Sequence, residues 1–362
     1  MNSPARKPLL AVTQGDVAGV GPETIVHAWA DPELRAVADI VVVGHPEVMR
    51  GAARLFGDCV RVIEVESPEQ ARELSGEAGT PALPCLPCGE DVIVDVPPGQ
   101  IDPRAGAAAY AAVVRAAGLA LDGQVDGVTT APLSKAALWR AGHRYPGHTE
   151  LLAHLCGVDS FAMMLYLPPG DAVRGPAGLG VVHVTLHAAL RTVADSINTE
   201  AIVDKCRLAN RAMLNLGAAT PRIGVCALNP HAGEEGLFGD EEQRIIAPAV
   251  AAARSEGWNV SGPLPADTLM AAGRDGTYDA IVAMYHDQGH IALKLLSMHR
   301  AVNITLGLPI VRTSAAHGTA FDLAWQGRAD WGGMAAALRV AAQLAKRAAG
   351  PDHDEHDELP LA

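Results

Sequence analysis

The feature that most constrains the fold is an alternation of short β-branched runs with longer alanine-rich segments. The short runs are largely apolar and lie at 9–14, 39–44, 61–65, 126–132, 161–167, 179–186, 222–228 and 279–285. The longer segments have helical composition and lie at 104–121, 134–141, 195–216, 239–256 and 332–348. Strands that are buried on both faces give continuous apolar runs. The alternation therefore predicts an α/β fold with a mostly parallel sheet.

The length of the chain predicts two domains, because 362 residues exceed the size at which a single core stops growing. No internal repeat or long linker separates them. The domain division must therefore be discontinuous or made by short crossings. Residues 351–362 form an acidic segment that we expect to be a mobile tail.

The formal charge of −13 disfavours nucleic acid and anionic membranes as partners. An anionic ligand must then be held by a local positive pocket. The chain has only five lysines against twenty-three arginines, so a lysine inside a motif is informative.

The N-terminal apolar run is too short for a secretory signal, and no apolar run is long enough to span a membrane. Six cysteines are scattered, and the CxxC pair Cys85–Cys88 lies in a proline-flanked segment, predicted to be a loop, without a second pair nearby. A structural zinc site needs four ligands. We therefore expect reduced, unpaired thiols and a cytoplasmic protein.

Two segments have the composition of ligand-binding turns. QGDVAGVGPE (14–23) follows a strand, and Gly15, Gly19 and Gly21 allow a tight turn before a helix. It is also compatible with a tight loop that binds nothing. YPGHTE (145–150) places His148 and Thr149 at a helix start, where amides can hold a phosphate or carboxylate. Thr149 can equally serve as an N-cap.

Three histidines follow the ends of strands: His187, His231 and His286. Ligands bind at the carboxyl ends of parallel strands, and three nitrogens with an open position suit a catalytic divalent ion. His183 competes with His187 and is interpreted as a core or supporting residue. His290 is predicted to line the pocket, and Gly289 argues against a regular helix through HDQGH.

The segment 294–324 contains an apolar run, NITLGLPIV, between Lys294 and Arg312, and the run begins with Asn303. Lys294 and Arg312 are either surface residues or cleft residues that bind an anion. The planar guanidinium of an arginine is well suited to binding an anion. The polar turn HGTAFD (317–322) follows.

Together these residues resemble the 4-hydroxythreonine-4-phosphate dehydrogenase family. The resemblance spans nearly the whole chain through GDVAGVGPE, TAPLSK, YPGHTELLA, NPHAGEEGLFGDEE, GPLPADT, AMYHDQGH and VNITLGLPIVRTSAAHGTAFDLA. It implies two α/β/α domains like those of isopropylmalate and isocitrate dehydrogenases, with a cleft between them. We place the cofactor domain at 1–130 plus 315–350, and the metal, substrate and dimer domain at 131–314.

The resemblance also implies roles for particular residues. His187, His231 and His286 would bind one divalent ion (Zn, Mg, Mn or Co) across a homodimer interface. The substrate would contact His148, Thr149, Lys294, Asn303 and Arg312, with His290 at the pocket edge. The adenosine of NAD, or of NADP, would lie on His317, Gly318, Thr319 and Ala320, and the glycines of the 14–23 turn are also assigned to cofactor binding.

The sequence departs from the family at LHAAL (186–190), where THxPL is usual, which bears on the assignment of His187. The segment HDQGHIALKLL favours the branch acting on D-threonate or D-erythronate 4-phosphate over the branch of pyridoxal phosphate biosynthesis, which acts on 4-phosphooxy-L-threonine. The family also contains cis-dihydrodiol dehydrogenases of aromatic diacids, which gives an alternative substrate class.

The predicted reaction is NAD-dependent and metal-dependent oxidation of a 4-phosphorylated 3-hydroxy acid, followed by decarboxylation. Lys294, Asp267 and Asp287 are the catalytic candidates; the two aspartates would either transfer a proton or orient a ligand histidine. A zinc hydrolase would use the same histidines without NAD, and a sugar-phosphate sensor would keep only the anion pocket.

Overall fold

The computed structural model describes residues 6–74 and 79–348, so the predicted acidic tail lies outside the described residues. The chain divides into two compact units, Met1–Gly157 with Leu308–Ala362 (unit 1) and Val158–Gly307 (unit 2). The crossings between units therefore lie at 157/158 and 307/308, whereas the sequence placed them near 130 and 314. Residues 131–157 belong to unit 1 because α6 (Lys135–Arg140) and α7 (His148–Cys156) pack against α5 (Pro103–Leu121).

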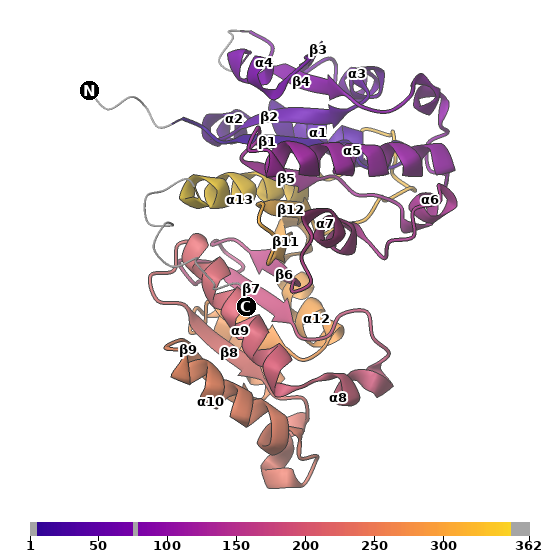
Figure 1. The fold of residues 1–362 in the computed structure, drawn as a ribbon. Coiled ribbons are helices and arrows are strands. Elements are labelled where there is room, and N and C mark those ends of the chain that lie inside the picture. The colour runs from indigo at the N-terminus through magenta and orange to yellow at the C-terminus, as the bar shows by residue number, and fades with distance from the viewer. Residues whose placement is uncertain (1–5, 75–78, 349–362) are drawn as a thin grey trace, which may run out of the picture. The chain divides into compact units, whose positions relative to one another are not determined.

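The sheet of unit 1 is parallel throughout (Figure 1). Its strand order is β3 (Arg61–Glu64), β4 (Ala82–Pro87), β2 (Asp39–Gly44), β1 (Leu9–Thr13), β5 (Gly127–Thr130) and β12 (Arg312–Ala315). Its other helices are α1 (Gly21–Ala30), α2 (Pro32–Val37), α3 (Pro46–Leu55), α4 (Pro68–Glu73), a 3-10 turn η1 (Asp91–Asp95) and α13 (Gly332–Ala348).

The central strand β1 explains the two cores of unit 1, because alternate residues of a strand point to opposite faces. Leu10 and Val12 pack into a cluster with α1, α3 and α13, which includes Ile25 and Leu338. Leu9 and Ala11 pack on the other face, in a cluster that includes α5. Both faces of β1 are therefore buried, as its continuous apolar sequence predicts.

Unit 2 has a mixed sheet. Its strand order is β11 (Val302–Leu306), β6 (Ala162–Leu167), β7 (Leu179–His183), β10 (Ala280–Ala283), β8 (Arg222–Cys226) and β9 (Asn259–Leu264). Strand β6 is antiparallel to both neighbours, and the remaining pairs are parallel. Its longer helices are α9 (Thr199–Asn215), α10 (Ala247–Ser255), α11 (Ala266–Arg274) and α12 (His286–Ser297). Short turns η2 (Leu190–Thr192), α8 (Val193–Ser196), η3 (Pro230–Gly236), η4 (Glu242–Ile246) and η5 (Met298–Arg300) connect them.

The mostly parallel α/β fold is confirmed, with three local differences from the sequence prediction. The CxxC segment, expected to be a loop, contains β4, with Cys85 fully buried in it; the prolines concealed this strand, since proline inside a run argues against one. Strands β9 and β12 were not predicted. The NITLGLPIV run is interrupted at Gly307, where φ is +88° and a Cβ would lie 2.4 Å from the Ser160 carbonyl oxygen.

All six cysteines are free, as the sequence predicts. Within residues 6–74 and 79–348, no helix is both long enough and apolar enough to cross a membrane.

Candidate functional site

The histidines of unit 2 are brought together by two neighbouring parallel strands. Strand β7 ends at His183 and leads to His187, while β10 ends just before His286, which begins α12. Because β7 and β10 pair in parallel, their carboxyl ends lie at the same edge of the sheet. Along α12, His286, His290 and Lys294 are four residues apart and so lie on one side of the helix.

His187 and His286 line a common cavity of about 320 Å³, with ring centroids 6.2 Å apart. Its other lining residues are Leu186, Ala188, Leu190, Val193, Tyr285 and Asp287. His187 is exposed and His286 half-buried. Two imidazole rings at the wall of a cavity are suitable ligands for a divalent ion.

His286 contacts Asp287 and His290, and His290 in turn contacts His183. The Nδ1 of His286 lies 2.7 Å from Oδ1 of Asp287, and its ring stacks on that of His290 with centroids 3.8 Å apart. His290 Nδ1 in turn lies 3.1 Å from Nε2 of His183. Burial, followed by the neighbouring histidines, lowers the pKa of His183 to about 3; burial, followed by His286, lowers that of His290 to about 4. Both rings are therefore neutral, and one donates to the other.

The position of His290 corrects the sequence prediction in two respects. The side chain is only 6% exposed and lies between His183 and His286 rather than at a pocket edge. Helix α12 also runs unbroken through Gly289. A Cβ on Gly289 would lie 2.5 Å from both His183 Nε2 and Val181 Cγ1. The glycine therefore allows close packing of helix on strand rather than ending the helix.

His231 lies elsewhere on unit 2, on the exposed turn η3. Among the residues that the structure describes, no three His, Cys, Asp or Glu side chains gather closely enough to hold an ion. The ligand set His187, His231 and His286, shared between two chains, thus stays a prediction.

Gln288 connects the two loops that carry His286 and His231. Its Oε1 accepts from the Met284 amide at 2.7 Å, and its Nε2 donates to the Ala227 carbonyl oxygen at 2.7 Å. The carboxamide thereby links the end of β10 to the end of β8. Gln288 received no predicted role from the sequence, although it lies inside the HDQGH motif.

The remaining candidates of unit 2 occupy three elements. Asn303 lies on β11 with a buried Oδ1 that has no hydrogen-bond partner. Lys294 is half-buried on α12. Asp267 is exposed at the start of α11, where its Oδ1 accepts from the Thr268 amide at 2.8 Å.

Unit 1 contains a cluster of cationic and polar groups around the start of α7. Arg312 is the first residue of β12 and is 3% exposed, and its Nη2 donates to Oγ1 of Thr130 at 2.6 Å. Burial lowers its pKa to about 10, so the guanidinium keeps its charge at neutral pH. His148 begins α7, next to the half-buried Thr149.

Burial, followed by the charges of Arg312 and Lys135, holds the pKa of His148 well below its usual value. Its Nε2 is buried without a hydrogen-bond partner. A neutral imidazole with a free ring nitrogen, beside two cations, is suited to receive an anionic or hydroxylated ligand.

Lys135 was missed by the sequence analysis. Its Cε lies 3.6 Å from the position of a Cβ on Gly147, the residue before His148. The signal was available, because Lys135 is one of five lysines and ends the TAPLSK segment.

The two segments predicted to bind the cofactor touch each other in unit 1. The Val20 amide donates to the Thr319 carbonyl oxygen at 3.0 Å, and a Cβ on Gly19 would lie 2.8 Å from that oxygen. A Cβ on Gly15 would lie 2.4 Å from the Pro132 oxygen, and one on Gly21 2.6 Å from the Gln14 oxygen. These glycines are thus required for packing, whatever the turn binds. His317, beside Gly318 and Ala320, has a buried Nε2 without a partner.

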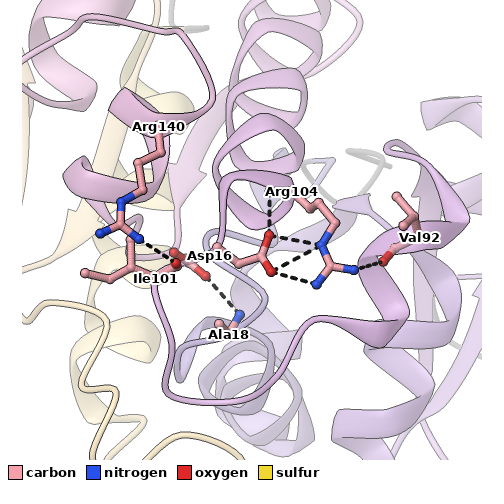
Figure 2. Close-up of polar contacts among 7 residues, drawn as sticks. Asp16, Ala18, Val92, Ile101, Arg104 and Arg140 are labelled. Carbon is pink, nitrogen blue, oxygen red and sulfur yellow. Dashed lines mark hydrogen bonds and ion pairs between the residues drawn. The ribbon is translucent and has the colours of Figure 1, made fainter.

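Asp16 is a fully buried carboxyl group in the 14–20 turn. Its Oδ1 accepts from the Ala18 amide at 2.9 Å, whereas Oδ2 is buried without a partner (Figure 2). The Gly99 amide donates to the Ala18 carbonyl oxygen. Arg104, drawn in the same view, donates to Asp102 and to the Val92 carbonyl oxygen. Burial raises the pKa of Asp16 to about 6.

Comparison with known proteins gives consistent similarities. Residues 36–341 match the family described as pyridoxal phosphate biosynthetic protein PdxA. The chain is 46% identical to a 4-hydroxythreonine-4-phosphate dehydrogenase of Geobacter metallireducens, over 95% of this chain and 97% of the relative. It is 43% identical to a D-threonate 4-phosphate dehydrogenase of Cupriavidus necator, over 94% and 98% of the two chains.

A solved structure agrees with these relatives. The crystal structure of 4-hydroxythreonine-4-phosphate dehydrogenase from Klebsiella pneumoniae superposes with a TM-score of 0.80 at 42% identity. The match covers 94% of this chain and 100% of that one.

Proposed function

The chain belongs to the PdxA family and is an oxidoreductase, and from this premise we propose that it oxidises a 4-phosphorylated 3-hydroxy acid of four carbons. The substrate is 4-phosphooxy-L-threonine or the 4-phosphate of D-threonate or D-erythronate. NAD, with NADP as the alternative, is the proposed hydride acceptor. A divalent ion is the proposed second cofactor, and loss of carbon dioxide follows oxidation.

The observation that carries this proposal is the cavity shared by His187 and His286. When bound there, a divalent ion would supply positive charge that favours loss of the substrate hydroxyl proton and stabilises the charge left by departing carbon dioxide. Asp287 holds the Nδ1 side of His286, which leaves Nε2 for the ion, as ligand histidines require. We therefore assign Asp287 the orienting role and keep proton transfer for Asp267.

The anionic ends of the substrate are assigned to the cationic groups. In unit 1, Arg312 keeps its charge in a buried position, and Thr130 fixes its guanidinium. His148, Thr149 and Lys135 complete this group. In unit 2, Lys294 and Asn303 are the proposed substrate contacts, with the unpartnered Asn303 Oδ1 available to accept a hydrogen bond from a hydroxyl or ammonium group.

The nicotinamide cofactor, which takes the hydride from the substrate carbon, is assigned to unit 1. The unpartnered His317 Nε2 and the adjoining 14–20 and 317–320 turns support this placement.

Exposed apolar residues on unit 2 support a homodimer. Ile291 and Leu295 are 58% and 81% exposed on α12, the helix that His286 begins, and Met298, the first residue after that helix, is 50% exposed. Leu237, in the loop of His231, is 72% exposed. Large exposed apolar side chains near functional residues are typical of subunit interfaces. A second copy of the chain would cover them and supply a ligand to the shared metal.

The free thiols support the proposed cytoplasmic location.

The test is reduction of NAD by the purified protein with the three 4-phosphorylated acids and a divalent ion. We expect the 4-phosphates of D-threonate or D-erythronate to be oxidised at least as well as 4-phosphooxy-L-threonine, with release of carbon dioxide. His187→Ala is the inactive control. Reduction of NAD only with aromatic dihydrodiols, or with none of these compounds, would contradict the proposal.

A further inference from the structure

We propose that Glu242 is a positioning residue for His231: its buried carboxylate holds a left-handed turn that presents the imidazole to the metal. This inference rests on the proposed function, because it takes His231 as a metal ligand. Glu242 does not contact the substrate or the ion in this proposal. It acts through the backbone of residues 228–235.

The turn is unusual because six consecutive residues have positive φ. The values are 53° at His231, 55° at Ala232, 80° at Gly233, 43° at Glu234, 54° at Glu235 and 98° at Gly236. In this region the Cβ of an L-residue crowds the following carbonyl oxygen, so only the two glycines adopt it without a steric cost. The four side-chain-bearing residues of the run must therefore be held there by contacts outside the turn.

Glu242 provides those contacts from the start of η4. Its Oε1 accepts from the Leu228 and Asn229 amides at 2.8 and 2.7 Å, and its Oε2 accepts from Asn229 Nδ2 at 3.1 Å. The residue is only 3% exposed. Burying a carboxylate is unfavourable unless hydrogen bonds compensate, and three N–H donors do so here.

The turn also packs directly on this carboxylate. A Cβ on Gly233 would lie 2.7 Å from Glu242 Oε2, so only glycine fits at the point of contact. The Phe238 and Leu237 amides close the turn by donating to the Gly233 and Glu234 carbonyl oxygens, each at 3.1 Å. The backbone that carries His231 is thus held both by the Glu242 carboxylate and by the hydrogen bonds that close the turn.

This arrangement is not accounted for by packing alone. His231, Glu234 and Glu235 are exposed, and Leu237 at the tip is 72% exposed, so the strained backbone buries little apolar surface. Strained backbone held by its surroundings is concentrated at functional sites. The same loop is linked through Ala227 and Gln288 to the loop of His286. The turn therefore has the properties expected of a rigid backbone segment that holds a metal-binding side chain in place.

The test uses Co²⁺ titration of the full-length, metal-depleted protein, followed by visible absorption below the unfolding temperature. Gly233→Ala drives a methyl group into Oε2 from the turn side. Glu242→Gln keeps an acceptor for the two amides and replaces only Oε2. Glu235→Ala is the matched control, because it removes an exposed carboxylate from the same turn without touching Glu242.

We expect Gly233→Ala to weaken Co²⁺ binding by about ten- to a hundredfold, the usual effect of losing support behind a ligand. Glu242→Gln should have a smaller effect, because it preserves two of the three hydrogen bonds. Glu235→Ala should match wild type. A residue with a merely structural role would lower the unfolding temperature and leave the Co²⁺ affinity of the folded protein unchanged.

Two results would overturn the inference while leaving the proposed function intact. One is wild-type Co²⁺ affinity in both Gly233→Ala and Glu242→Gln, with affinity lost in His231→Ala. The other is equal weakening in Glu235→Ala and Glu242→Gln, which would indicate a general effect of charge. If His231→Ala instead binds Co²⁺ as wild type does, the proposed ligand set itself is wrong, and the inference falls with it.

Discussion

Arg312 combines near-complete burial with a charge that persists at neutral pH, in a chain whose formal charge is −13. Burying such a group is costly unless a negative charge lies near it, and the carboxylate of Glu150 supplies one such charge. Thr130 fixes one nitrogen, and His148 lies within its electrostatic influence. These properties distinguish Arg312 from the surface arginines, which the sequence alone did not do.

Arg312→Lys is expected to lower kcat/KM by about ten- to a hundredfold, which corresponds to about 1.5–3 kcal/mol for a lost charge-assisted hydrogen bond. An ammonium cannot reproduce the planar pair of contacts that a guanidinium makes. Steady-state kinetics with the 4-phosphorylated acids provides the measurement. Arg222→Lys, at a salt bridge of unit 2 with Asp279, is the control. Unchanged kinetics in Arg312→Lys would remove this residue from the anion pocket.

Asp16 gives a prediction on pH and stability. Its folded pKa of about 6 exceeds the ordinary 3.8, so protonation favours the folded state. That contribution is complete below pH 3.8 and is lost as the pH rises through 6. Asp16→Asn stays neutral and keeps an acceptor for the Ala18 amide. It should therefore exceed wild type in the free energy of unfolding by up to about 3 kcal/mol above pH 6.

Urea unfolding of wild type and Asp16→Asn at about pH 4 and pH 7.5 measures this difference. The two proteins should be nearly equal at the lower pH and diverge at the higher one. A lower stability of Asp16→Asn at pH 7.5 would mean that the ionised carboxylate has a compensating partner.

The proximity of His187 and His286 was predictable because it follows from topology. His187 and His286 were placed together because each follows a strand, and the two strands are parallel neighbours. Lys135, Glu242 and Gln288 were not identified. Their roles depend on contacts between loops distant in the chain, for which a single sequence has no periodic signal.

Among the helices and strands, α12 was likewise only partly predictable from the sequence. Its apolar and polar sides follow the helical repeat, yet Gly289 led to the prediction that it was irregular. The glycine is needed instead for close contact with β7. Continuous apolar strands such as β1, β2 and β8 were predictable, whereas β4 was hidden by its prolines and β9 was not predicted. Local composition identifies an element reliably only where packing does not require an atypical residue, such as a glycine inside a helix or a proline inside a strand.

Gln288→Leu tests the link between β10 and β8. The change leaves the Met284 amide and the Ala227 carbonyl without their side-chain partner, which should lower the free energy of unfolding by about 1–3 kcal/mol. Urea denaturation is the measurement, with exposed Gln243→Leu as the control. Equal stability of the two variants would show that water replaces the carboxamide at no cost.

For the whole molecule, the decisive question is whether one chain could complete the proposed metal site. His231 is apart from the cavity of His187 and His286, while apolar residues on α12 are exposed. Both features agree with the proposed homodimer, in which each site takes ligands from two chains.

Subunit mixing tests that proposal. His231→Ala and His286→Ala should each be inactive alone, because two nitrogens hold a divalent ion poorly. If the two ligands come from opposite chains, a mixed dimer has one intact site, so roughly half of the wild-type activity per mixed dimer is expected. Activity is measured after refolding the variants together and isolating the mixed dimer by two affinity tags. Absence of activity in verified mixed dimers would place both histidines on the same chain.

The chain crossings at 157/158 and 307/308 make unit 2 an insertion within unit 1. Strand β5 pairs with β12, from Val128↔Arg312 to Thr130↔Ser314, and α13 follows β12 in the chain. During synthesis on the ribosome, β5 must therefore wait for roughly half the chain before its neighbour β12 emerges. Unit 2, being continuous, can complete its own sheet first. Its residues should thus become resistant to protease in stalled nascent chains that still leave residues 6–157 susceptible.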